Sequence, residues 1–200
     1  MDQNTTYDYL KEKLDQTDMY YKDFKQEFKE YKKTDKVMTM FLETSPNEII
    51  TVKVVVESNS PFEKIVRAVQ DLSYFKQITP DLEQWVIVDK NVLYEIHHCK
   101  TKAKTDMIFG EVKKIDQSLA YFTSASVDYP SILIEQERTL TNYILNSTVV
   151  EKINDNQSKV TFILCQNIAR FDVKTNNKIL LESVPPYLES LSKAFESYPY

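Results

Sequence analysis

The chain has 200 residues, which is enough for one ordinary domain with a sizeable core. Hydrophobic residues make up 42% of the sequence and charged residues 28%, and this balance predicts a folded, soluble chain rather than a disordered one. The formal net charge is -5 and no basic face is clustered, which argues against nucleic acid as the principal partner, because phosphate binding needs such a cluster.

The rare residue types exclude further classes of protein. Gly110 is the single glycine, whereas loops that cradle the phosphates of nucleotides need several. Cys99 and Cys165 form no spaced disulfide framework, so we expect two buried thiols and a reducing, cytoplasmic compartment. The N-terminus has no apolar stretch typical of a signal peptide, and no run of about 18 apolar residues predicts a membrane span. We expect no cofactor.

Apolar and aromatic side chains recur at alternating steps of three and four residues in the first part of the chain, and they predict a long amphipathic helix within residues 1–34. The stripe consists of Tyr7, Leu10, Leu14, Thr17, Tyr21, Phe24, Phe28 and Tyr31. It can pack on the domain that follows over residues 35–200, or part of it can dock on another protein. We expect residues 21–31 to pack on the domain, and the first turns, with Tyr7, Leu10 and Leu14, to be free for a protein partner.

From residue 36 the pattern changes to short runs rich in β-branched and aromatic residues. Residues 37–42 and 49–56 predict a hairpin around a turn at 45–47, and a helix follows with Ser60 as its N-cap and Pro61 at its first position. Further strands are predicted at 85–88, 92–99, 107–114, 119–127, 139–152 and 159–168. Short turns between several of these strands predict antiparallel neighbours.

Apolar residues at helical spacing over 179–195 predict a C-terminal helix, which Pro185 and Pro186 kink or restart. The predicted order is a helix, two strands, a helix, a run of strands and a last helix. This order predicts an α+β fold in which a long antiparallel sheet wraps around the terminal helix.

Several segments resemble the START lipid-transfer domains, in the order in which that family has them. Residues 82–99, LEQWVIVDKNVLYEIHHC, resemble a strand pair that contains VLYE, and 105–108 resemble the start of the RDF strand. Residues 124–130, SASVDYP, resemble the S-V-x-x-P segment, and Arg138 falls where the next strand often opens with arginine. The resemblance covers residues 36–198 and implies a helix-grip fold: a curved antiparallel sheet closed around a C-terminal helix, with an apolar tunnel for one lipid.

Strand alternation sorts the side chains around the two histidines. We assign to the interior the mostly apolar face that carries Val92, Tyr94, Ile96 and His98. His98 is then either a core histidine with satisfied polar atoms or a polar contact in the tunnel. His97 and Cys99 point the other way, so this segment alone cannot converge three ligands on an ion, and we predict no metal site. The residues predicted to contact lipid are Tyr94, Ile96, His98, Asp106, Arg138, Asn142, Leu188 and Leu191.

Asp106 and Arg138 each begin an apolar strand, where a partly buried charge needs a partner. An ion pair or a lipid head group would satisfy them, and both alternatives stay open. The lysines at 32–33, 100–104 and 113–114 lie among acids, so we expect a solvated face with at most transient contact to a membrane.

These patterns predict a non-enzymatic domain that holds one hydrophobic molecule in an internal tunnel, driven by burial of apolar surface. The alternative is a structural subunit of a larger cytoskeletal, ciliary or mitochondrial assembly, held by the N-terminal helix and with ligand binding weakened. Two departures from the family support it: Thr105 replaces the usual arginine, and Glu111 stands where sterol-binding members would have a charged ligand contact. An enzyme ranks third, because only His98 and Asp106 offer a candidate acid–base pair.

Overall fold

The structure is a computed structural model that describes residues 3–22, 28–44, 48–168 and 170–200. Its helices are α1 (Gln3–Lys22), α2 (Phe62–Gln70), α3 (Leu72–Ile78), α4 (Val173–Glu182) and α5 (Val184–Glu196). Its strands are β1 (Lys29–Lys33), β2 (Val37–Leu42), β3 (Thr51–Ser58), β4 (Leu82–Lys90), β5 (Glu95–Thr101), β6 (Thr105–Ile115), β7 (Leu119–Ser126), β8 (Thr139–Asn154) and β9 (Gln157–Ile168).

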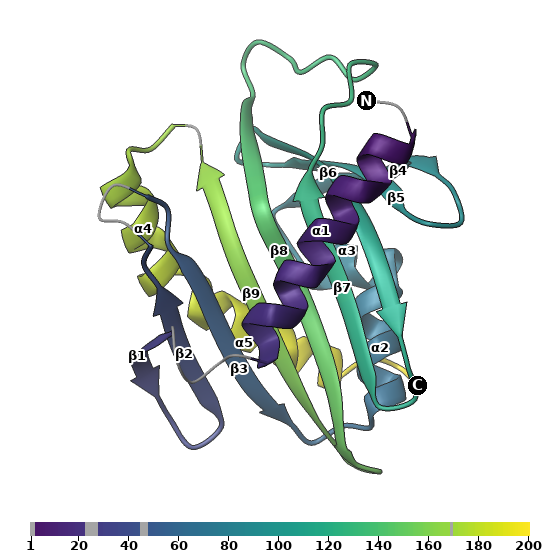
Figure 1. Cartoon of the computed structure of the whole chain (residues 1–200), viewed down its shortest axis with the longest axis vertical. Helices are drawn as coiled ribbons and strands as arrows, with labels where there is room; N and C mark the ends of the chain where they lie inside the picture. The colour runs from purple at the N-terminus through teal and green to yellow at the C-terminus, as the bar shows by residue number, and fades with distance from the viewer. Residues whose placement is uncertain (1–2, 23–27, 45–47, 169) are drawn as a thin grey trace.

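The strands form one nine-stranded sheet in the order β1-β2-β3-β9-β8-β7-β6-β5-β4 (Figure 1). Neighbours in this order are antiparallel, and β6 additionally meets β8 in parallel, where Thr105 faces Thr139. The strands predicted from residue 37 onward all appear, with ends shifted by a few residues. The predicted turn at 45–47 lies outside the described residues.

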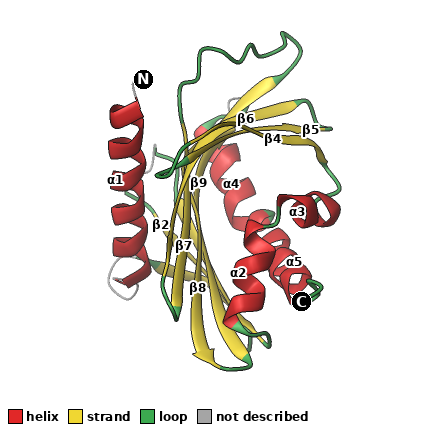
Figure 2. Ribbon diagram, turned by 90° about the vertical axis from the view of Figure 1, so that its right-hand side faces the viewer, coloured by secondary structure: helices red, strands yellow, loops and turns green. Residues whose placement is uncertain are grey.

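Helices cover both faces of the curved sheet (Figure 2). α1 lies against β6, β7, β8 and β9 on the outer face, and α2 to α5 lie on the inner face. The inner core joins the sheet to α2, α4 and α5 through side chains such as Val54, Phe162, Leu180, Leu191 and Phe195. The outer core gathers Leu10, Tyr94, Ile96, Ile108, Val112, Ala125 and Val127. This arrangement confirms the predicted α+β helix-grip architecture.

The N-terminal helix is shorter than predicted. α1 ends at Lys22, Phe24 lies outside the described residues, and Phe28 is buried immediately before β1. Residues 29–33 form an edge strand that pairs with β2, from Lys29 opposite Phe41 to Lys33 opposite Met38. The prediction failed here because aromatic residues at single-turn intervals fit a helical stripe, whereas a short, fully exposed edge strand has no periodicity that could compete with it.

The first turns of α1 pack on the domain itself. Leu10 is fully buried in the outer core, and the half-buried side chains of Tyr7 and Leu14 pack against the same cluster. Leu10 is therefore not available to a partner in this structure, which corrects the expectation that these turns form a free arm. Among the described residues of the stripe, Leu10 and Thr17 are fully buried.

Polar contacts hold the rest of α1 to the sheet. The Thr17 hydroxyl shares hydrogen bonds with Ser147 Oγ at 2.7 Å and Thr123 Oγ1 at 3.1 Å, all of them buried. Near the end of the helix, Lys53 Nζ donates to the carbonyl oxygens of Tyr20 at 2.6 Å and Tyr21 at 3.2 Å. The last carbonyl groups of a helix lack partners within it, so this buried lysine completes the C-terminus of α1 from the sheet below.

The helices on the inner face begin and end at identifiable residues. α2 begins at Phe62 with Pro61 as its N-cap residue and no capping side chain, so the predicted N-cap at Ser60, with Pro61 at the first helical position, is wrong. The carbonyl of the buried Ser60 accepts a hydrogen bond from the Ser158 hydroxyl at 2.6 Å. The Asp71 side chain accepts from the backbone N–H groups of Ser73 and Tyr74, which starts α3. Pro185 and Pro186 stand in the first turn of α5, so the predicted restart of the C-terminal helix is confirmed.

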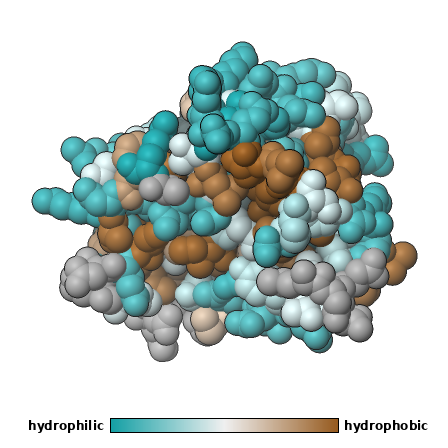
Figure 3. All heavy atoms as spheres, turned by 90° about the horizontal axis from the view of Figure 1, so that it is seen from above, coloured by the Kyte–Doolittle hydropathy of each residue, from teal (hydrophilic) through white to brown (hydrophobic). Residues whose placement is uncertain are grey.

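The loop between β7 and β8 crosses the end of the molecule that is uppermost in Figure 1. Ile132 and Ile134 pack against the outer core, whereas Leu133 between them is 88% exposed. Viewed from this end, hydrophobic residues gather in the middle of the face within a hydrophilic border (Figure 3).

Gly110, at the centre of β6, lets α1 approach the sheet closely. A Cβ atom at this position would lie 2.6 Å from Leu10 Cδ1 and 3.2 Å from Val127 Cγ1. The absence of a side chain on one strand residue therefore makes room for the deepest residue of α1.

We predict that Gly110→Ala destabilises the domain by about 1–3 kcal/mol through overpacking. Leu10→Ala should cost about 2–5 kcal/mol by leaving a cavity, and the double variant should cost less than the sum of the two. Urea unfolding of the four proteins measures this coupling. Strictly additive losses would contradict the close packing of Leu10 on Gly110.

Candidate functional site

A cavity of about 480 Å³ lies between the inner face of the sheet and the C-terminal helix. Strand residues on its wall include Trp85, Cys99, Met107, Phe109, Glu111, Phe122, Ser124, Tyr143, Asn146, Phe162 and Leu164. The helices contribute Phe75, Val184, Tyr187, Leu188, Leu191 and Phe195. The wall is mainly apolar and aromatic, with a few polar groups, which is the usual character of a site for a small hydrophobic molecule.

The structure places only part of the predicted lipid-contact set at this cavity. Leu188 and Leu191 of α5 line it. Tyr94 and Ile96 belong to the outer core under α1, and Asn142 is exposed on the outside of β8, next to the cavity residues Thr141 and Tyr143. The predicted assignment of Tyr94, Ile96 and Asn142 to the cavity is therefore wrong.

The error lies in the choice of face. Alternation along β5 separates the two sets correctly, but Cys99 and Thr101, not Ile96 and His98, point into the cavity. Because α1 buries the outer face, residues on both faces of β5 are buried, and the more apolar face is the outer one. No signal in the strand itself marks which face meets the cavity.

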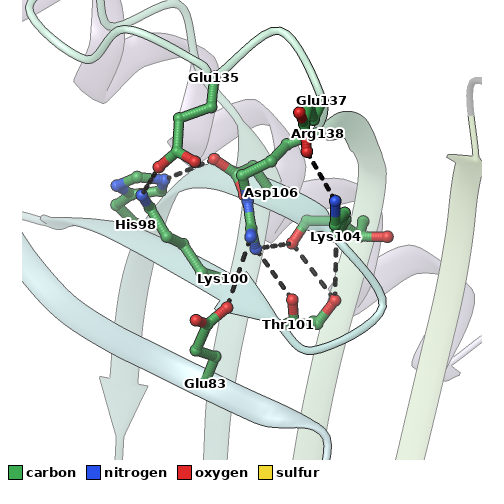
Figure 4. A network of polar contacts seen from close by, with 10 residues as sticks. Glu83, His98, Lys100, Thr101, Lys104, Asp106, Glu135, Glu137 and Arg138 are labelled. Carbon is green, nitrogen blue, oxygen red and sulfur yellow. Dashed lines mark hydrogen bonds and ion pairs between the residues drawn. The ribbon is translucent and has the colours of Figure 1, made fainter.

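His98, Asp106 and Arg138 meet on the outer side of the sheet (Figure 4). Asp106 is fully buried; one of its carboxylate oxygens pairs with Arg138 Nε, and the other lies 3.2 Å from His98 Nε2. Arg138 Nη2 donates to the carbonyl oxygens of Thr101 at 2.9 Å and Thr105 at 3.4 Å. The parallel contact of β6 with β8 brings the two charged residues together, so the ion-pair alternative is the one found, and none of the three lines the cavity.

Surface ion pairs extend this network and account for part of the lysine-rich segment. Lys100 pairs with Glu135, and Lys104 with Glu137, each at 2.7 Å (Figure 4). These pairs tie the loop before β8 to the β5–β6 hairpin.

An aromatic wall closes the cavity beside β5. The His97 ring stacks on Phe109 at a centroid distance of 5.1 Å, and His97 Nδ1 accepts a hydrogen bond from Trp85 Nε1 at 2.9 Å. Burial lowers the pKa of His97 to about 4, against the opposing effect of Glu95. His97 is therefore a neutral ring packed against the cavity residues Trp85 and Phe109, and its importance was not visible in the sequence because these two residues come from other strands.

Glu95, His97 and Glu111 bring three potential metal-ligand atoms within 4.8 Å of one another. Two observations argue against a metal there. Trp85 Nε1 can only donate, so His97 Nδ1 carries no proton and Nε2, the atom facing Glu95, carries it. Lys113 Nζ lies 2.8 Å from Glu95 and 3.2 Å from Glu111, so an ammonium group already stands between the carboxylates.

The ionisable groups on the cavity wall are few. Burial raises the pKa of the Cys99 thiol and of the Tyr143 hydroxyl, and Tyr143 Oη lies 2.9 Å from Met107 Sδ. Burial also raises the pKa of Glu111, against the opposing effect of Lys113. The wall thus offers hydrogen-bonding groups, the paired carboxylate of Glu111 and two exposed charged residues, Asp81 and Arg170, without a thiolate.

Arg138→Met should destabilise the domain by about 3–5 kcal/mol, because it leaves the Asp106 carboxylate buried without its main partner. Replacing both residues, as Asp106→Leu with Arg138→Met, should cost clearly less than the two single changes together. Urea unfolding checks this. A lipid-contact role would instead appear as weaker lipid binding at unchanged stability.

The pKa of His97 makes stability depend on pH in a defined direction. At pH values between the ordinary pKa of 6.5 and the folded pKa of about 4, His97 is protonated in the unfolded chain and neutral in the folded chain. Stability should therefore fall as the pH drops from 6.5 to 4, with His97 contributing up to about 3 kcal/mol. Urea unfolding of His97→Gln at both pH values should show a smaller fall, and an identical fall would contradict this role.

Among the described residues, every helix is too short or too polar to span a lipid bilayer. No family model matches the sequence, and no curated protein matches it.

Solved structures, in contrast, match almost the whole chain. Human STARD10 is 12% identical, with a TM-score of 0.84 over 92% of this chain and 79% of the other. Human StAR-related lipid transfer protein 5 is 10% identical, with a TM-score of 0.84 over 98% of this chain and 99% of the other. The Zhui aromatase/cyclase from a Streptomyces species is more distant, at 11% identity and a TM-score of 0.51 over 74% of this chain and 91% of the other. The chain therefore has the helix-grip fold of the START domains.

Proposed function

We propose that this protein binds one lipid or similar hydrophobic molecule in the inner cavity and carries it through water without changing it chemically. The observation that carries the proposal is the cavity itself, whose volume of about 480 Å³ lies within the usual range for ligand sites, roughly 300–1,000 Å³. Large apolar side chains line it, so a hydrophobic molecule bound there would be stabilised by the transfer of its apolar surface out of water. The names of the lipid-transfer proteins that share the fold support the same ligand class.

The size of the cavity favours a compact ligand. At about 480 Å³ it lies in the lower half of the usual range for ligand sites, roughly 300–1,000 Å³, which suits one acyl chain or one fused ring system better than two long acyl chains.

The polar groups favour an uncharged head group. Glu111 is paired with Lys113, so the inner wall carries no unbalanced charge at that point. The hydroxyl of Ser124 lies 3.4 Å from Glu111, and the amide of Asn146 lies on the same wall. These groups can exchange hydrogen bonds with an alcohol or a carbonyl group of the ligand.

The arrangement also supports a binding role over an enzymatic one. His98 and Asp106 do meet, but outside the cavity, and Asp106 is already paired with Arg138. Cys99 inside the cavity is held as a thiol by burial. The structural-subunit alternative is weakened because Leu10, which was expected to bind a partner, is buried on the protein's own sheet.

Leu188→Trp tests the site, because the larger side chain would fill space between α5 and the sheet. Binding of a fluorescent fatty acid or a fluorescent sterol, delivered from cyclodextrin, should weaken by at least about tenfold. Leu133→Trp, on an exposed loop position, is the matched control and should bind as the wild type does.

Native mass spectrometry of the purified protein provides a second measurement that does not depend on the choice of probe. A co-purifying hydrophobic molecule should be present in the wild type and depleted in the Leu188→Trp variant. Neither a co-purifying molecule nor uptake of either probe by the wild type would overturn the proposed function.

A further inference from the structure

A row of polar side chains crosses the inner face of the sheet. Glu111 of β6 lies opposite Ser124 of β7, and Ser124 lies opposite Asn146 of β8. All three residues line the cavity. The inward positions two residues earlier on β6 and β7 are Phe109 and Phe122, which also line it. The row is therefore a polar strip between aromatic side chains, and three different strands build it.

Asn146 carries polar groups that the protein leaves unpaired. Within the part of the chain that the structure describes, its side-chain amide forms no hydrogen bond. Leu145 and Ser147 on either side of it are buried, whereas Asn146 is only half-buried because it borders the cavity. A ligand that displaces water from such an amide binds more weakly unless it replaces the hydrogen bonds of that water.

The free hydrogen-bonding capacity of the row is mostly that of acceptors. Ser124 Oγ donates to Glu111 Oε2 at 3.4 Å, so the lone pairs of the serine oxygen remain free. Asn146 adds one carbonyl oxygen and one NH₂ group, and the Glu111 carboxylate keeps further lone pairs. A head group that donates a hydrogen bond as well as accepting one therefore matches the row. Alcohols and amides do both, whereas an ester can only accept.

The charges beside the row are already balanced. Lys113 pairs with Glu111 and Glu95, and Lys90 pairs with Glu95 as well. Two ammonium groups thus stand with two carboxylates. An anionic head group at the row would add a charge without a partner next to Glu111, which is costly away from water. The row therefore favours a neutral head group over a carboxylate or a phosphate.

The row lies toward the buried end of the cavity. Phe162, which lines the cavity at that end of β9, is buried, whereas Arg170, which lines the other end, is exposed. Asn146 lies opposite Leu164, near the buried end, and Thr141 lies opposite the last residue of β9, nearer Arg170. A ligand with its head group at the row would direct its apolar part toward the Arg170 end.

We propose that Asn146, together with Ser124 and Glu111, selects a lipid whose head group is uncharged and donates a hydrogen bond, an alcohol or an amide, and holds this head group at the buried end of the cavity. This inference rests on the proposed function and adds to it the chemical class of the ligand and its orientation.

Four lipids with the same chain length test the selection. Tetradecanol, tetradecanamide, methyl tetradecanoate and tetradecanoate are offered to the protein in equal amounts from cyclodextrin near neutral pH. The bound lipids are then extracted after gel filtration and quantified by mass spectrometry. The wild type should retain the alcohol and the amide in at least about tenfold excess over the ester and the carboxylate. Equal retention of the ester or of the carboxylate would overturn the selection.

Asn146→Leu removes the amide on which the selection depends. Its preference for the alcohol over the methyl ester should fall to within about threefold, and its urea unfolding should show no loss of stability, because an unpaired polar group is removed. Asn142→Leu is the matched control: it makes the same change on the same strand, at a residue exposed on the outside, and should keep the wild-type preference. Asn146→Val repeats the test with a smaller, β-branched side chain. An unchanged preference in both Asn146 variants, or a lost preference in Asn142→Leu, would overturn the role of Asn146.

Thr141→Val tests the orientation, because it removes a buried hydroxyl nearer the Arg170 end with little change in volume. It should alter the binding of the alcohol and the methyl ester by the same factor, so that their ratio stays at the wild-type value. Loss of this preference in Thr141→Val would place the head group at the opposite end and overturn the orientation.

The same mixture separates this inference from the proposed function. Retention of all four lipids without preference by the wild type would overturn the selection alone. Retention of none of them would count against the proposed function, and the selection would fall with it.

Discussion

The sheet of this protein must be covered on both faces, and the rest of the structure follows from that constraint. The outer face needs α1, whose Leu10 reaches the space left by Gly110. The inner face needs α2, α4 and α5, but the sheet curves away from them. Covering a curved surface with straight helices leaves a gap that side chains such as Leu188 and Phe109 do not fill, and that gap is the cavity.

The buried charged groups of Asp106 and Lys53 lie where partners from distant elements satisfy them. Asp106 depends on Arg138, and the contact between β6 and β8 makes the pair possible. Lys53 reaches the end of α1 across a buried layer. Such pairs stabilise a fold chiefly by avoiding the cost of an unpaired buried group, and they place charge away from the cavity. The inner wall is left mostly apolar, which suits a ligand with little charge.

The aromatic wall shows how the same principle shapes the site. The hydrogen bond from Trp85 defines the tautomer of His97, and burial keeps the ring neutral. A histidine that could elsewhere act as a ligand or a base instead packs as a neutral ring behind the cavity residues Trp85 and Phe109. Nearby, Lys113 pairs with both carboxylates that could have held a metal ion, and Lys90 pairs with Glu95 as well. The chemistry of these residues is thus decided by their neighbours on other strands, and it favours containment of a hydrophobic molecule.

The sequence by itself determined the strands beyond residue 37 and their order along the chain, the break at Pro185 and the alternation of side chains along each strand, because these depend on local periodicity and backbone chemistry. It did not determine which face of β5 meets the cavity, since α1 covers the outer face and makes that face the more apolar one. It also did not separate β1 from the helix before it, because the pairing of Lys29 with Phe41 is a long-range contact. The partners of His97 and Asp106 come from residues 12 and 32 positions away, so only the tertiary structure could assign them.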